Sequence, residues 1–139
     1  MKIILRERKN YIIRLDKDDE IIEALTVFCT KHKIQSGFFI GLGAAKEAVL
    51  SDYNLKTKKY TDKLIKNGME IVGLTGNIGK LDNKVIIHSH TVLSSFSKGI
   101  TGGHVKKLVI GATCEIFIQV FSKAIKRKFS AEIGLNLMK

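Results

Sequence analysis

Apolar residues at helical spacing occur in a single segment of this chain, and this restricts the possible folds more than any other sequence feature. The segment follows Asp16 and Asp18, and the basic run 31–33 closes it, so its charges suit the dipole of a helix. Its apolar residues lie three and four apart, as on one helical face: Ile21, Ile22, Leu25 and Phe28. We therefore predict one amphipathic helix here and few helices in the whole chain.

The remainder is predicted to be β-structure. Two short Ile-rich runs, residues 2–8 and 11–15, alternate loosely around Lys9-Asn10, as two strands joined by a turn would. Further along, turn residues at Asn67-Gly68 and Asp82-Asn83 separate the apolar stretches. The strands expected there are the glycine-punctuated stretch 37–53, Val85–Ile87, Leu108–Phe121 and a last one over Phe129–Leu137. One helix against many strands defines an α+β domain.

The length fits one compact domain over residues 1–139, large enough to bury a core without disulfides. Cys29 and Cys114 stand alone, without a CxxC motif, so we expect buried thiols in a reducing cytoplasm. No apolar stretch is long enough to span a bilayer. Because the apolar run before Arg6 is very short, we expect no signal peptide.

The net charge is +11, from 24 Lys and Arg against 13 Asp and Glu, and such a basic field attracts phosphate backbones. Only four of these residues are arginines, which read bases better than lysines do: Arg6, Arg8, Arg14 and Arg127. The densest basic patch is Lys126-Arg127-Lys128. Charge therefore predicts non-specific contact with nucleic acid. The alternative is that a Lys- and Ile-rich, Pro-free composition reflects AT-rich codons alone.

Three of the four histidines fall in one window, His88-Ser89-His90 followed by His104. Residues two apart on a strand point to the same face, so His88 and His90 can converge on one ion. Gly102-Gly103 gives the backbone freedom to bring His104 over that face. Three imidazoles without a thiolate make an open site, for which Zn²⁺ is the default and Ni²⁺, Co²⁺ and Mn²⁺ are alternatives. The other interpretation is two ordinary strand histidines and a loop histidine.

Several motifs resemble the PPC domain (plants and prokaryotes conserved) family. They are GLG at 41–43, Tyr60, GNI at 76–78, HSH at 88–90, GGHV at 102–105, and Arg14-Leu15 before the acidic helix-opening segment. The most specific part is HxH followed by GGH, with Glu115 inside the next strand. The resemblance covers nearly the whole chain.

This resemblance implies a compact α+β fold, mainly an antiparallel β-sheet with few helices, that assembles as a homotrimer. It also implies that His88, His90 and His104 bind a metal, usually zinc in prokaryotic members. Plant members read DNA through an Arg-Gly-Arg-Pro AT-hook, a motif this Pro-free chain lacks, and prokaryotic members are often regarded as DNA-binding by similarity. The histidines are also similar to the acetolactate decarboxylase site, where a three-histidine zinc polarises a substrate carbonyl.

These residues are compatible with two functions. In the first, which we favour, the protein is a DNA-associated or regulatory module that binds duplex DNA weakly and non-specifically, and its metal is structural or a sensor. In the second, it is a metal-dependent enzyme or a binder of a small carbonyl or carboxylate compound. Arg14 would then clamp an anion, and Glu70 or Glu115 would act as acid or base. Each glutamate could instead be an edge-strand or salt-bridge residue.

Overall fold

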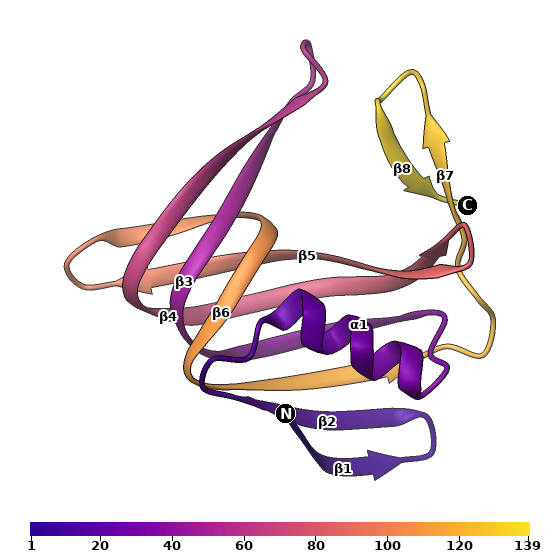
Figure 1. Ribbon diagram of the computed structural model, residues 1–139, viewed down its shortest axis with the longest axis horizontal. Helices are drawn as coiled ribbons and strands as arrows, with labels where there is room; N and C mark the ends of the chain where they lie inside the picture. The colour runs from indigo at the N-terminus through magenta and orange to yellow at the C-terminus, as the bar shows by residue number, and fades with distance from the viewer.

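The computed structural model describes residues 1–139 as one helix and eight strands (Figure 1). In chain order the elements are β1 (Lys2–Glu7), β2 (Asn10–Asp16), α1 (Ile21–Lys31), β3 (Gly37–Asn54), β4 (Lys59–Leu81), β5 (Lys84–Ser95), β6 (Gly99–Val120), β7 (Arg127–Ser130) and β8 (Leu135–Met138). This confirms the predicted α+β domain with a single helix. The protein has no helix that could span a membrane.

Six strands form one antiparallel sheet in the order β1-β2-β6-β3-β4-β5. The sheet curls because β5 also pairs with the first part of β6, so the four long strands β3, β4, β5 and β6 pair in a cycle. Strand β6 therefore pairs with β3 along most of its length, with β5 on the other edge at its start (99–104) and with β2 on that edge near its end (113–119).

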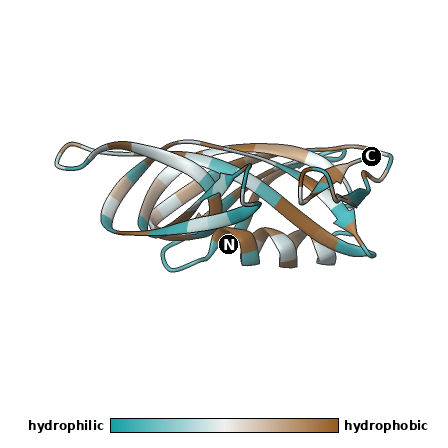
Figure 2. Ribbon diagram, turned by 90° about the horizontal axis from the view of Figure 1, so that it is seen from above, coloured by the Kyte–Doolittle hydropathy of each residue, from teal (hydrophilic) through white to brown (hydrophobic).

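Helix α1 covers one face of the sheet, and the two layers are seen edge-on in Figure 2. Alternate residues of the strands point at the helix, as the period of two in a strand requires. The largest fully buried side chains lie on α1 and on strands β2 to β6, and they form the core: Phe28, Phe39, Ile13, Leu15, Ile21, Leu25, Ile71, Leu74, Ile78, Leu93, Leu108 and Ile110. The predicted apolar face of the helix is thus confirmed.

The other face of the sheet carries an exposed row of apolar side chains. Leu5 lies opposite Ile12, Ile12 opposite Phe117, and Phe117 opposite Ile40, so the row crosses β1, β2, β6 and β3. Together with Phe38 these residues line an open cavity of about 280 Å³. We call this set, Leu5, Ile12, Phe38, Ile40 and Phe117, the apolar row.

Several predicted strand bounds were wrong. The strand expected over Val85–Ile87 is part of the longer β5, and the strand expected over Leu108–Phe121 is part of β6, which begins at Gly99. Asn67-Gly68 does not separate two strands, because β4 runs through both residues and takes up the irregularity as a shift of register against β3. The expected last strand over Phe129–Leu137 is a hairpin, because the chain turns back before Leu135 and pairs Phe129 with Asn136. The turn at Asp82-Asn83 is confirmed, and both residues have the positive φ angles that Asp and Asn tolerate.

The β7–β8 hairpin is attached to the sheet at both of its ends. At its base, the backbone N–H of Lys80 donates to the carbonyl of Ile125 (2.8 Å). Near its tip, the Tyr53 hydroxyl donates to the carbonyl of Ile133 (2.6 Å) and the Lys58 ammonium to that of Ala131 (2.8 Å). In Figure 1 this hairpin and the tip of the β3–β4 hairpin rise on the same side of the sheet.

We expect Gly76→Ala to lower the free energy of unfolding by about 1–3 kcal/mol, the usual cost of forcing extra atoms into a packed site. A Cβ at Gly76 would overlap the ring of the buried Phe39 and lie 2.6 Å from the carbonyl oxygen of His88. The matched control is Gly73→Ala in the same strand, where a Cβ meets no atom within 4 Å. Urea unfolding of the two variants measures the difference, and equal losses would contradict this packing.

Candidate metal centre

The three histidines of the sequence motif converge on the face of the sheet opposite α1. His90 on β5 pairs directly with His104 on β6, and His88 precedes His90 by two residues on the same face. The ring centroids are 5.2 Å apart for His88 and His90, 5.1 Å for His88 and His104, and 5.4 Å for His90 and His104. One ligand nitrogen from each ring lies within 4.8 Å of the other two.

Strand register brings these residues together, whereas the sequence analysis attributed the position of His104 to the backbone freedom of Gly102-Gly103. Positions directly opposite in an antiparallel pair share a face, so the pairing of β5 with β6 places His104 beside His90. Gly102 contributes by allowing close approach, because a Cβ there would lie 2.7 Å from the carbonyl oxygen of Thr91. Its role is to make room between the strands.

Burial favours the neutral form of two of the three imidazoles. His88 and His104 are half-buried, whereas His90 is exposed. Burial lowers the pKa of His88 to about 4, helped by the nearby His104, Arg127 and His90. Burial also lowers the pKa of His104, and His90 adds to that effect. Neutral imidazoles keep the lone pair that a metal ligand needs.

One buried nitrogen atom indicates that the cluster binds a further partner. His104 Nδ1 is inaccessible to solvent and has no hydrogen-bond partner, which is unusual for a buried polar atom. Three imidazole nitrogens form the kind of ligand set that zinc and related divalent ions accept. The three-histidine cluster could therefore hold a metal ion.

Aromatic and acidic residues flank the cluster on the side of the β3–β4 hairpin. The Tyr60 ring lies 5.3 Å from the His104 ring and 4.8 Å from the Tyr53 ring. Asp62 accepts a hydrogen bond from Ser51 (2.7 Å), which pairs directly with His104, and forms an ion pair with Lys106. These partners hold the pKa of Asp62 below its usual value.

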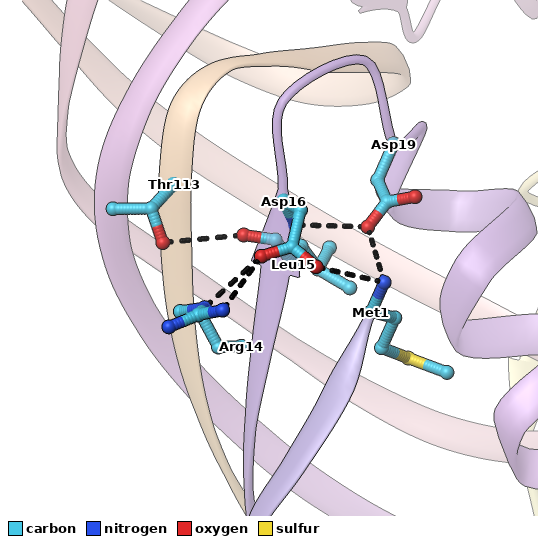
Figure 3. Close-up of polar contacts among 6 residues, drawn as sticks. All are labelled: Met1, Arg14, Leu15, Asp16, Asp19 and Thr113. Carbon is cyan, nitrogen blue, oxygen red and sulfur yellow. Dashed lines mark hydrogen bonds and ion pairs between the residues drawn. The ribbon is translucent and has the colours of Figure 1, made fainter.

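The three residues considered for anion binding or acid–base chemistry lie elsewhere on the sheet. Arg14 donates through Nε to Asp16 at 3.0 Å, and Asp16 also contacts the N-terminal ammonium (Figure 3). Glu115 pairs with Arg14 across β2 and β6. Glu70 lies opposite Ser94 on β4 and β5. The structure brings none of them into the cluster of three histidines.

Sequence reasoning did not select Arg127 as a site residue. Its Nη2 donates to Asn77 Oδ1 at 2.5 Å, and Asn77 pairs directly with His88. The only sequence signal was its place in the densest basic patch of the chain. Nothing in that patch indicated which of its cations turns toward the sheet.

An antiparallel sheet covered by one helix, with three histidines converging on its uncovered face, defines a class of small α+β protein with a surface site suited to metal. The sequence profile of the Plants and Prokaryotes Conserved (PCC, also written PPC) domain matches residues 5–122. The chain therefore belongs to this family, as its motifs predicted.

Solved structures of similar proteins agree with the fold. A "putative DNA-binding protein" from Bacteroides thetaiotaomicron is 32% identical, with a TM-score of 0.93 over 97% of this chain and 94% of that one. A "putative DNA-binding protein" from Ralstonia eutropha is 26% identical, with a TM-score of 0.90 over the same shares. A "metal-containing protein" from Archaeoglobus fulgidus is 26% identical, with a TM-score of 0.88 over 100% and 99% of the two chains. No curated protein matches the sequence.

We expect the metal-free protein to lose stability as the pH falls from about 6.5 toward 4. His88 has a pKa of about 4 when folded, and an unfolded histidine has a pKa of about 6.5. The unfolded chain therefore binds the proton more readily in this range, so the contribution is fully present above 6.5 and is lost on acidification.

Urea unfolding at pH 7 and pH 4.5 measures the effect, and NMR titration of the His88 ring checks its cause. The variant His88→Gln should show a shallower loss, because carboxylates that also titrate in this range remain in both proteins. A His88 ring that titrates near 6.5 in the folded protein would contradict the assignment.

Proposed function

We propose that this protein is a metal-binding member of the PPC family that associates weakly, and without sequence preference, with duplex DNA. Two structural neighbours named "putative DNA-binding protein" support this proposal, as does the net charge of +11. The observation that carries it is one cavity with a strongly basic wall.

This basic cavity, of about 430 Å³, lies where the β1–β2 turn, the end of α1 and the end of β6 meet. Four cations line it, and no Asp or Glu does: Arg6, Arg8, Lys9 and Lys33. None of the four forms an ion pair in the structure. Unpaired cations gathered in one hollow attract phosphate groups and release counterions from them.

The fold provides no element shaped for reading bases. Helix α1 packs one face against the sheet, and its first turn is acidic, with Glu20 as its N-cap and Glu23 beside it. This acidic end of α1 would repel the phosphates of DNA. Contact through the basic cavity therefore reaches the DNA backbone, which positions a protein without carrying sequence information.

For the metal, we propose that His88, His90 and His104 hold one divalent ion, with zinc favoured by the all-nitrogen ligand set. The neighbour named a metal-containing protein supports this site. An ion bound there would supply a positive charge able to polarise a carbonyl or bind an anion. The protein's own contribution is to keep three neutral rings together at the surface.

We also propose a homotrimer. The apolar row gives the supporting observation, since Phe38, Ile40 and Phe117 are 42–49% exposed and adjoin across β3 and β6. A contiguous apolar patch of this kind marks an interaction surface. A closed ring of three identical chains would cover it and bring three basic cavities into one assembly.

Residues 1–139 are proposed to form one domain in the cytoplasm. The hairpin beyond residue 122 is tied to the sheet through Arg127 and Tyr53, which supports including it with the family-matched part. Burial raises the pKa of both cysteine thiols, Cys29 and Cys114, to about 12, so neither forms a thiolate near neutral pH. Two unpaired, inert thiols suit a reducing compartment.

Purified protein should carry about one metal ion per chain, and His104→Ala should lose most of it. With one of three ligands removed, the remaining pair holds an ion poorly. Elemental analysis measures the content, and His32→Ala is the matched control, because His32 is the C-cap of α1 and lies outside the cluster. Full occupancy in His104→Ala would refute the site.

Binding to a short duplex should be steeply salt-dependent, with log K falling by about 0.9 per phosphate contacted for each unit of log salt. Random and AT-rich duplexes should compete nearly equally. Neutralising Arg6, Lys9 and Lys33 together to Gln should flatten the slope. The matched control neutralises Lys56, Lys59 and Lys63, three exposed residues on and beside the β3–β4 turn.

Fluorescence anisotropy at a series of salt concentrations gives both slopes. Equal slopes for the two triple variants would show that the basic cavity is not the contact surface. A thousandfold preference for one sequence would instead indicate a dedicated regulator and contradict the proposal.

Light scattering should give a mass about three times the chain mass of 15.5 kDa. Phe117→Asp should release monomers, because it places a charge in the middle of the apolar row. Val27→Asp is the control, since Val27 is exposed on α1, away from that face. A monomer at micromolar concentration for the unaltered chain would contradict the trimer.

A further inference from the structure

Arg127 brings a positive charge to the edge of the histidine cluster. It begins β7, and its side chain crosses to β4, where Nη2 contacts the Asn77 side chain and Nε lies over Gly79. Asn77 is the direct strand neighbour of His88. The Arg127 side chain therefore lies beside the strand neighbour of His88.

This cation has no anion to balance it. A guanidinium has five N–H groups. Two of those on Arg127 are used, toward the backbone carbonyl of Asn136 (2.8 Å) and toward Asn77. Nε is buried without a partner, and no carboxylate lies within ion-pair distance. A half-buried cation in this state is costly unless an anion joins it.

A metal ion bound to the histidines would add to this unbalanced positive charge. A divalent ion on three neutral imidazoles keeps both of its charges, and Arg127 adds a third beside it. The one carboxylate near His104 is Asp62, which already pairs with Lys106 and accepts from Ser51. Asp82 lines a cavity together with Arg127 but forms no ion pair with it, so no carboxylate of the chain pairs with this cation.

We propose that the histidine cluster and Arg127 together bind a small carboxylate anion, with the free Nη N–H groups of Arg127 holding the carboxylate. The inference rests on the metal site proposed above. A planar carboxylate suits the flat fork of a guanidinium better than it suits a lysine ammonium.

The test uses the full-length protein loaded with Co²⁺, whose visible absorption reports changes among the metal's ligands. Acetate is the probe, and inorganic phosphate and chloride are separate arms. Acetate should shift the spectrum, and Arg127→Gln should raise its half-saturating concentration at least about tenfold with the metal content unchanged. Lys128→Gln is the matched control, since the exposed Lys128 is the next residue of β7 and points to the opposite face.

In Arg127→Gln the hairpin could detach from the sheet, so a second variant tests the anion site while the Arg127 contact is kept. Asn77→Asp nearly preserves shape and keeps the contact with Arg127, but it supplies an anion from within the chain. Acetate binding should weaken in this variant as well. Hydrogen exchange over residues 125–139 reports whether the hairpin stays attached in each protein.

The outcomes separate the two proposals. Metal uptake without any response to acetate, or equal acetate responses in the unaltered protein and both Arg127→Gln and Asn77→Asp, would overturn the inference and leave the metal site standing. A response to phosphate alone would show that the carboxylate assignment is wrong. Failure to take up Co²⁺ or Zn²⁺ would overturn the metal site and the inference with it.

Discussion

The antiparallel register between β5 and β6 is the constraint on which the rest of this structure depends. His90 faces His104 only in this register, and the same alternation turns Thr91 and Leu93 into the buried side. Sliding one strand by a single residue would exchange the two faces. Because β6 also pairs with β2 and β3, such a slip would have to break the ladders of the whole sheet. The site is therefore fixed by the same pairing that closes the core.

The three histidines and the apolar row occupy one continuous face. Across the sheet, His90 pairs with Thr75, Thr75 with Ile40, and Ile40 with Phe117. A single threonine thus separates the proposed metal site from the proposed trimer surface. A subunit packed on Ile40 would lie next to the histidines, so the proposed assembly would restrict solvent access to the proposed metal site.

Much of the fold could be predicted because its signals are local, as the spacing of Ile21, Leu25 and Phe28 shows for the helix. The strand across Asn67-Gly68 could not be predicted, since an irregularity within a sheet and a turn use the same residue types. The HxH and GGH motifs located the candidate ligands, although the register that joins them is set by pairings distant in sequence. Arg127 was missed because a charge in a basic run gives no indication of its direction. It reaches the site only because the C-terminal hairpin folds back over β4.

The β7–β8 hairpin and the three histidines belong to parts of the fold that can change independently of each other. The histidines belong to the sheet, whose pairing tolerates little change, whereas the hairpin joins it through one arginine and a few bonds to backbone carbonyls. Its turn between Ser130 and Leu135 can vary in length or sequence without disturbing a ladder of the large sheet. In the proposed site, changes in the hairpin can therefore alter the ligand that fits beside Arg127 while the three histidines keep their positions.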